Sequence, residues 1–309
     1  MENKDINNKD MKDREEKQDA DEKKTGEDEI IEEATEEISK EENIEKEVCE
    51  EGSEEKETGK EEAESSIADK YEMFYDLHTH TTYSHGKGTV EENVREAFNR
   101  NMEFVAISDH GPGHLFYGVN REDFVNMRND IERMNVKYPK MNIKMSVEAN
   151  IVKSGNGLDI RPEEFDEFDF VIAGYHYGLF GCSCVRNWLW SKGIKIGEES
   201  LRESNTRMVT EALRKNDISI LTHPGDKGPF DIRTIAEVCA ETDTLMEINT
   251  WHGHMTEEEI RTAAQVEDVK FIISSDAHSP GRVGDFKEGL ERAIRAGLDV
   301  KRIVNIRER

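Results

Sequence analysis

Histidines and carboxylates at short spacings are the residues of this 309-residue sequence best suited to chemistry. All ten histidines lie between His78 and His278. His78 and His80 are separated by one residue, so on a strand both side chains would point to the same side. Imidazole nitrogens combined with carboxylate oxygens, and without thiolates, suit Zn, Mn or Fe. The pattern therefore predicts metal binding rather than a serine or cysteine nucleophile.

Seven short apolar runs, separated by helical patterns, are the elements that must position these residues. Their alternation predicts an α/β fold with a parallel sheet, either open or closed into a barrel. A polar residue follows each run, and in a (β/α) barrel the carboxyl ends of the strands meet at one mouth. The predicted strands are Met73–Leu77, Phe104–Ser108, Ile143–Val147, Phe168–Ala173, Ile218–Thr222, Leu245–Ile248 and Phe271–Ser274.

The residues at these strand ends include nine candidate metal ligands. One histidine alone would more often be a core or surface residue, but their joint placement after consecutive strands favours ligands. We interpret Asp76, Glu247 and Asn249 as residues that support the metal ligands, since a carboxylate commonly orients a ligating histidine through its second ring nitrogen. Asp109 could act in the same way or touch the substrate. The candidate ligands are His78, His80, His85, His110, Glu148, His176, His223, Asp276 and His278.

Helical patterns connect most of the strands. Thr89 with Glu92, and Thr256 with Glu259, form the sequence signature of a capping box. Two segments carry no clear helical pattern: 152–166 reads as a loop, and Gly178–Gly197 as an irregular insertion that forms a wall beside the mouth. Further helices are predicted over Arg121–Tyr138, Glu198–Lys215, Asp231–Ala240 and Phe286–Ala296.

Residues 1–70 differ in composition from the rest of the chain. They hold 29 Asp and Glu against 12 Lys and Arg, with no Phe, Tyr, Trp or Leu. Such a segment buries too little apolar surface to offset chain entropy, so we expect a disordered acidic tail followed by one domain over residues 71–309.

The overall composition excludes several classes of function. A net charge of −27 argues against duplex nucleic acid as a partner, because such binders need a basic face. No run of about 18 apolar residues is present, so no membrane span is expected. Four cysteines in this context indicate free thiols and a cytoplasmic protein.

Seven short motifs, in a fixed order, resemble those of the PHP (polymerase and histidinol phosphatase) superfamily. The resemblance covers residues 73–306 and is strongest to bacterial phosphatases and hydrolases with a trinuclear metal site. The motifs are Asp-Leu-His-Thr-His at 76–80, Ser-Asp-His-Gly at 108–111, Glu-Ala-Asn at 148–150, Ala-Gly-Tyr-His at 173–176, Thr-His-Pro-Gly at 222–225, Glu-Ile-Asn at 247–249 and Ser-Asp-Ala-His at 275–278.

The resemblance implies a distorted (β/α)7 barrel that holds two to three divalent metal ions, Zn, Mn or Fe. It assigns the first ion to His78, His80, Glu148 and Asp276. It assigns the second ion to His85, His110 and His278. It assigns the third ion to Glu148, His176 and His223, with Glu148 as a bridge between ions.

The function implied is hydrolysis of a small phosphorylated substrate by a metal-activated hydroxide. Arg186 and Lys227 could bind the phosphate, although a solvated surface charge explains each equally well. Cys182 and Cys184 are better explained as a reduced pair than as zinc ligands, and Trp188 and Trp190 as packing residues.

Three alternatives stay open at this point. PHP domains also act on nucleotides and on nucleic-acid ends, and the acidic composition does not exclude a nucleotide substrate. An amidohydrolase shares the His-x-His motif but often uses a carbamoylated lysine, where this chain carries Glu148 and His176. A non-catalytic metal-binding regulatory module would be expected to lack some ligands, and this site is complete.

Overall fold

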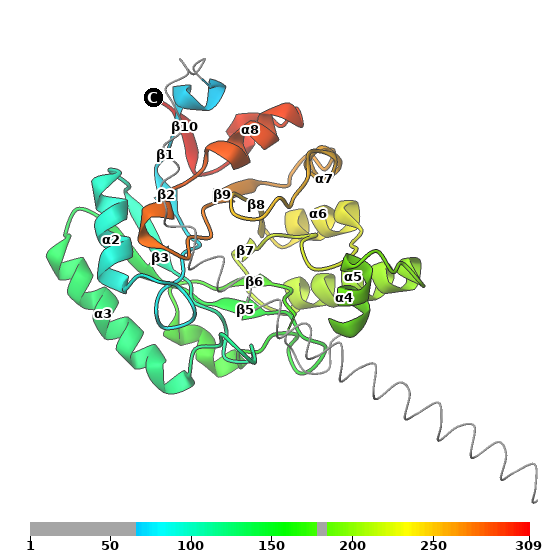
Figure 1. The fold of residues 1–309 in the computed structure, drawn as a ribbon, viewed down its shortest axis with the longest axis horizontal. Helices are drawn as coiled ribbons and strands as arrows, with labels where there is room; N and C mark the ends of the chain where they lie inside the picture. Colours follow the sequence, from blue (N-terminus) through cyan, green and yellow to red (C-terminus); the bar gives the residue numbers. More distant parts are fainter. Residues whose placement is uncertain (1–65, 178–183) are drawn as a thin grey trace, which may run out of the picture. The chain divides into compact units, whose positions relative to one another are not determined.

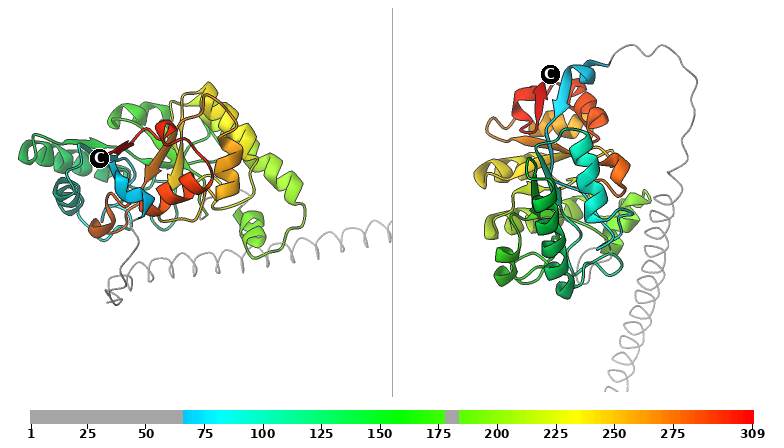
Figure 2. Two further views of the ribbon diagram at one scale, coloured as in Figure 1. Left: turned by 90° about the horizontal axis from the view of Figure 1, so that it is seen from above. Right: turned by 90° about the vertical axis from the view of Figure 1, so that its left-hand side faces the viewer.

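The computed structural model describes residues 66–177 and 184–309. The predicted acidic tail therefore lies almost entirely outside the described residues, as does Cys182. Within the described part, short parallel strands occupy the centre and helices lie around them (Figure 1). The views at right angles show the same arrangement (Figure 2).

Parallel strands follow one another in sequence order around the centre. The registers pair each strand with the next along the chain, except β4 with β5. A separate antiparallel pair joins β1 (Tyr71–Met73) to β10 (Ile306–Glu308). The parallel strands are β2 (Tyr75–Asp76), β3 (Phe104–Ile107), β4 (Asn142–Met145), β5 (Glu148–Asn150), β6 (Ile172–Gly174), β7 (Ile220–Leu221), β8 (Leu245–Asn249) and β9 (Phe271–Ser274).

The segment that forms β4 and β5 connects two sheets. β4 pairs with β3, and β5 pairs with β6. The amide of Glu148 nevertheless still bonds to the Asp109 carbonyl oxygen at 3.0 Å, and His110 and Glu148 form a parallel bridge. Residues 142–150 thus carry the hydrogen bonding from one sheet into the next, which makes the barrel distorted but continuous on this side.

The first and last parallel strands also meet. Thr79 and Ala277 form a parallel bridge beyond the ends of β2 and β9, with the His80 amide 2.9 Å from the Ala277 carbonyl oxygen. At the other end of these strands, the buried Asn305 side chain donates to the carbonyl oxygens of Ile273 and Tyr75 at 2.6 and 2.9 Å. These contacts close the ring of strands, as predicted for a distorted (β/α)7 barrel.

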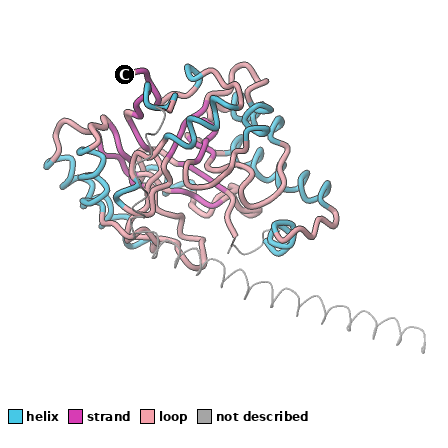
Figure 3. The backbone as a smooth tube through the Cα atoms, turned by 45° about the horizontal axis from the view of Figure 1, so that its top comes forward, coloured by secondary structure: helices cyan, strands magenta, loops and turns pink. Residues whose placement is uncertain are grey.

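Helices cover the outer face of the strands, seen as a cyan layer around magenta strands in Figure 3. The two predicted capping boxes are present: Thr89 and Thr256 accept from the amides of Glu92 and Glu259, whose carboxylates bond back. The helices are α2 (Val90–Asn99), α3 (Phe124–Lys137), α4 (Cys184–Ser191), α5 (Glu198–Lys215), α6 (Ile232–Glu241), α7 (Glu257–Ala263) and α8 (Lys287–Arg295).

Two apolar layers result from the alternation of side chains along the strands. Ile172, Ile220 and Ile272 form a small cluster of their own on β6, β7 and β9. Their chain neighbours, such as Ile273, pack instead in the large core cluster together with helix residues such as Leu290. The small cluster fills the barrel interior on the side opposite the mouth, so the polar strand ends sit on a packed support.

Three expectations about local structure need correction. Gly178–Gly197 is not irregular throughout, because α4 forms within it, with Asn187 and Trp188 buried. The predicted loop at 152–166 contains the start of a 3-10 turn at Pro162–Glu167. Several strands are shorter than predicted: β6 and β7 begin four and two residues later than expected, whereas β8 and β9 are as long as predicted or longer. None of the helices in the described ranges is long and apolar enough to cross a membrane.

Candidate metal centre

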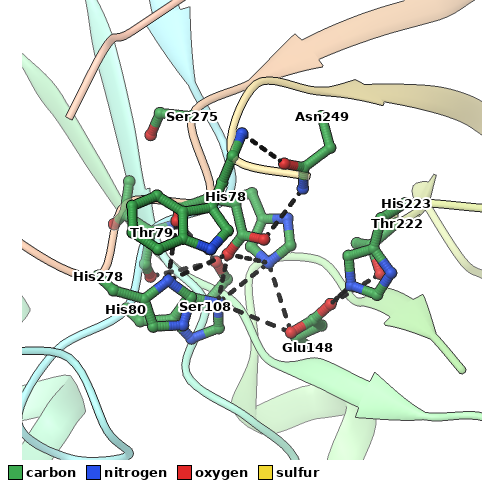
Figure 4. A network of polar contacts seen from close by, with 12 residues as sticks. His78, Thr79, His80, Ser108, Glu148, Thr222, His223, Asn249, Ser275 and His278 are labelled. Carbon is green, nitrogen blue, oxygen red and sulfur yellow. Dashed lines mark hydrogen bonds and ion pairs between the residues drawn. The ribbon is translucent and has the colours of Figure 1, made fainter. Parts of the chain in front are cut away.

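Glu148, at the start of β5, lies at the centre of the histidine cluster and is fully buried. Its Oε2 atom is 2.9 Å from His110 Nδ1 and 3.4 Å from His78 Nε2. Its Oε1 atom is 2.9 Å from His223 Nε2 and 3.3 Å from His176 Nε2. One carboxylate therefore faces two groups of histidines, and Figure 4 shows it between His78 and His223.

The first group has the spacing of a closed metal site. His78 Nε2 and His80 Nε2 are 3.1 Å apart, and Asp276 Oδ1 lies 3.5 and 3.1 Å from them. Glu148 Oε2 completes the group. Four ligands placed about 2.1 Å from one zinc ion in a tetrahedron would be about 3.4 Å apart. The four atoms converge as that geometry requires.

The other group around Glu148 has three members. His176 Nε2 and His223 Nε2 are 3.2 Å apart, and each faces Glu148 Oε1. Thr222, which the sequence reading missed, donates to the same oxygen at 2.7 Å. Catalytic zinc sites have three protein ligands, whereas structural zinc sites have four, so this group has the ligand number of a catalytic site.

A further group contains His80, His110 and His278, whose nearest ring nitrogens all lie within 4.8 Å of one another. His85 joins it, with its ring centroid 4.9 Å from that of His110 and 4.3 Å from that of His278. Tyr117 stacks on the His85 ring at 4.2 Å. The nine predicted ligands thus lie together, although His80 is shared between two groups where the family pattern assigned it to one.

Several buried polar atoms of the site have no hydrogen-bond partner, which indicates that the site fits bound metal ions. Glu148 Oε2 and Asp276 Oδ1 are buried without a hydrogen-bond donor, and so are the Nδ1 atoms of His80 and His176. Buried polar atoms are normally paired, and leaving a charged one unpaired is costly. Divalent cations would satisfy the two carboxylate oxygens.

Glu247 on β8 contacts two of the candidate ligands, one through its ring and one through its backbone amide. Its Oε1 atom accepts from His78 Nδ1 at 2.7 Å. The proton is thereby held on Nδ1, and the lone pair of His78 Nε2 faces the metal site. Its Oε2 atom accepts from the His223 amide at 2.8 Å. Asn249 donates to Glu247 Oε2 and to Asp276 Oδ2, both at 3.0 Å. Glu247 thus contacts one ligating ring, that of His78, whereas Asn249 contacts the carboxylates of Glu247 and Asp276 and no ligating ring.

Asp76 and Asp109 support loops rather than imidazole rings. Asp76 accepts from the side chain and amide of Ser275 and from the Gly284 amide. The oxygens of Asp109 accept from the Thr81 amide and hydroxyl at 2.7 and 2.6 Å and from Ser84 Oγ at 2.5 Å. Both carboxylates are fully buried. For Asp109 the geometry favours a positioning role over contact with substrate, and Asp76 accepts from the backbone amide of the ligand His78 at 3.4 Å.

Burial and charge together set the protonation of the site. Burial opposes ionisation of Glu148, but His176, His78 and His110 outweigh it and hold its pKa well below the ordinary value. Burial, reinforced by repulsion from His278, lowers the pKa of His80 to about 4. An ionised carboxylate and a neutral imidazole are the forms that bind metal. Burial opposes protonation of His78 and His223, but the neighbouring carboxylates outweigh it, so the pKa of His78 lies well above the ordinary value and that of His223 is about 9. These two histidines would therefore release a proton when metal binds.

Backbone strain occurs at two of the ligands. His223 and Asp276 have positive φ angles of 27° and 49°. Residues with a Cβ atom rarely adopt this region, and when they do they cluster at functional sites. Each lies two residues beyond the end of its strand, so the strained turn directs its side chain towards the centre.

The two predicted phosphate-binding residues differ in position. Lys227 follows His223 by four residues, is largely buried, and lies 3.2 Å from Asp226 with its ammonium over the Tyr177 ring. Arg186 on α4 donates to the Gly197 carbonyl oxygen and to Ser200, which places it among the residues of the insertion. Lys227 is therefore the better placed of the two candidates.

Sequence reasoning left His252 unassigned and did not consider Trp251 as a site residue. The structure places the Trp251 ring 5.9 Å from that of His278, and His252 Nε2 3.5 Å from Asp276 Oδ2. Both follow Asn249, so their position after β8 was the available signal. These two residues form part of the wall of the centre.

The fold and the centre define a class of protein, a metal-binding (β/α) barrel with a shared carboxylate. The chain belongs to the PHP domain family, which matches residues 76–251. It is 27% identical over 247 residues to a Shigella flexneri protein named "Probable phosphatase YcdX", covering 76% of this chain and 90% of that one.

Two further comparisons agree. "Probable phosphatase Teth514_1060" of Thermoanaerobacter sp. is 28% identical over 248 residues, covering 76% of this chain and 91% of that one. Histidinol phosphate phosphatase from Lactococcus lactis, solved with zinc, L-histidinol and phosphate, is similar in fold, with a TM-score of 0.51 and 15% identity. That match covers 74% of this chain and 95% of the other.

Proposed function

We propose that this protein is a metal-dependent phosphatase that hydrolyses a small phosphorylated substrate and holds two to three divalent ions. The observation that carries the proposal is the shared, buried Glu148, which faces histidines of two ligand groups with oxygens 2.9 to 3.4 Å from their nitrogens. The names of the relatives support the same class of reaction.

The rate acceleration needed is large, because phosphate monoesters are among the compounds that hydrolyse most slowly in water without a catalyst. Bound divalent ions supply an ionised water near neutral pH and neutralise charge on the phosphoryl oxygens. The residues of this chain provide the rest. Glu247, Asn249 and Asp109 fix the ligands and their loops, and Lys227 adds a positive charge beside His223.

The proposal also concerns the size of the natural substrate. The Lactococcus lactis protein was solved with L-histidinol and phosphate, which is a statement about that protein. At 15% identity it supports the fold and the size of substrate to be tested. We therefore propose a small phosphate ester and not a polymer, in keeping with the net charge of −27.

The test combines metal content and hydrolysis on one sample. Elemental mass spectrometry would give two to three metals per chain, and p-nitrophenyl phosphate and a panel of esters would be hydrolysed. His78→Ala and Glu148→Ala would lose both, whereas Arg233→Gln, on the exposed side of α6, would keep both. Metal without turnover on any ester would favour a binding or regulatory role, and no metal under any loading condition would refute the site.

A further inference from the structure

An aromatic and basic pair lies beside the metal ligand His278. The Trp251 ring centroid is 5.9 Å from the His278 ring centroid, with the planes tilted by 35°. The guanidinium carbon of Arg282 lies 4.3 Å from the Trp251 ring centroid. A charged planar group is thus stacked on the indole that borders the metal centre.

Both members of the pair are held in place by bonds that lead back to the centre. The amides of Trp251 and His252 each donate to Asn249 Oδ1 at 2.8 Å, and Asn249 also donates to the ligand Asp276. Arg282 ends the 3-10 turn that directly follows the ligand-bearing loop, with its amide bonded to the Ser279 carbonyl oxygen at 3.0 Å. The pair is therefore preorganised relative to the metal ligands.

Arg282 carries a charge that its surroundings do not neutralise. Across 66–177 and 184–309, no carboxylate lies within ion-pair distance of it, and its buried Nε atom has no hydrogen-bond acceptor. Its basic neighbours are paired: Arg100 with Asp285 at 2.8 Å and Lys287 with Asp69 at 2.6 Å. In so acidic a protein, an arginine left without a carboxylate beside the centre is suited to an external anion.

Space for such an anion exists next to the guanidinium. A pocket of about 290 Å³ is lined by Arg282, Thr250, Gly284 and Phe286, by the paired Arg100, Asp285 and Lys287, and by the carboxylate Glu288. The volume is many times that of a water molecule, which occupies about 30 Å³ in the liquid. The planar fork of arginine matches the two oxygens of a carboxylate or a phosphate.

We propose that Arg282, supported by Trp251, forms a subsite for a second anionic group of the substrate. The inference rests on the proposed function and deepens it: preferred substrates are phosphate esters whose leaving group carries a carboxylate or another phosphate. An ester whose leaving group carries an ammonium group is disfavoured at this subsite. Arg282 is a specificity-determining residue here and takes no part in the bond cleavage.

The test uses pairs of esters that differ in one group. Glycerol 3-phosphate and 3-phosphoglycerate differ by a carboxylate; fructose 6-phosphate and fructose 1,6-bisphosphate differ by a phosphate. The readout is the ratio of kcat/KM for the anionic member to that for its partner, in the metal-loaded full chain. Arg282→Gln should lower this ratio at least tenfold in one pair, Arg282→Lys less, and the exposed Arg233→Gln not at all. Whichever pair responds identifies the anion as carboxylate or phosphate.

A loss of equal size on both members of each pair, or no loss, would overturn the inference. If the wild-type protein hydrolyses none of the four esters, the proposed function fails for them, and calorimetric binding of the same esters decides the subsite. Binding of an anionic member that weakens at least tenfold in Arg282→Gln, with its partner less affected, supports it. Equal binding by both proteins overturns it. Circular dichroism of each variant separates these results from misfolding.

Discussion

Glu247→Gln is the substitution that best isolates the support of the metal ligands from the ligands themselves. The native carboxylate uses both oxygens as acceptors, one for His78 Nδ1 at 2.7 Å and the other for the His223 amide at 2.8 Å. Glutamine has the same shape but replaces one acceptor by an NH2 donor. That donor must face either the His78 ring or the His223 and Asn249 donors.

Either orientation weakens the site, and the size of the effect can be estimated. If the amide NH2 faces His78, it favours the tautomer that carries its proton on Nε2, the atom 3.1 Å from His80 Nε2 in the first ligand group. If it faces His223, two donors meet in a fully buried place. Loss of one hydrogen bond to a charged group costs about 1.5 to 3 kcal/mol, which corresponds to roughly 10- to 100-fold in metal affinity.

The assay is metal competition against a chromogenic chelator, run beside hydrolysis of p-nitrophenyl phosphate. In this competition we expect the metal affinity of Glu247→Gln to be roughly 10- to 100-fold lower than that of the wild type. We expect its activity to return when metal is added in excess. Glu237→Gln, an exposed glutamate on α6 paired with Arg233, is the matched control. Metal affinity and activity within twofold of wild type would refute the claim that Glu247 fixes the ligands.

The remaining predictions concern stability. Asn305→Leu should cost about 3 kcal/mol or more in chemical denaturation, because it leaves buried backbone groups of β2 and β9 unpaired; a cost below about 1 kcal/mol would contradict the closure that we assign to Asn305. Chelation should lower Tm, and zinc or manganese should restore it, because ions bind only the native site; an unchanged Tm in a sample shown to lose metal would contradict that coupling. Burial opposes ionisation of Glu164, but Arg161 and Arg121 outweigh it and lower its pKa to about 2. Its stabilisation is therefore complete above the unfolded pKa near 4.5 and lost as pH falls through about 2. Glu164→Gln should destabilise the protein by about 1 to 2 kcal/mol at pH 7, after a discount for the exposed arginines, and a difference from wild type that stays constant down to pH 2 would argue against an electrostatic origin.

The order of strands could be predicted because it depends on apolar runs and on the polar residues that follow them. His78, His110, Glu148 and His223 all come at or just beyond the end of such a run, and the barrel brings those positions together. This is a property of topology: once successive parallel strands close into a barrel, their carboxyl ends meet at one mouth. These residues could therefore be predicted to lie together without any use of the number of residues between the motifs.

Local structure within the insertion could not be predicted in the same way. α4 is short, and its buried side of Asn187 and Trp188 mixes polar and apolar residues. Asn187 is buried because Tyr175 and Asn205, from β6's loop and α5, supply its hydrogen bonds. A helix whose stability comes from such tertiary contacts leaves little apolar period in the sequence.

The residues around the metal ligands include some that the sequence predicts and some that it does not. Glu247 and Asn249 follow the pattern of the strand ends, so the sequence points to them. Trp251 and Arg282 do not, because they meet only when the turn after β8 and the turn after β9 are folded side by side. The metal ligands reflect what the barrel imposes on any chain with these motifs, whereas the Trp251–Arg282 pair depends on how two turns beyond the strand ends pack together. Chemistry and selectivity are thereby separable: loss of Glu148 should abolish hydrolysis of every ester, and loss of Arg282 should change only which ester is preferred.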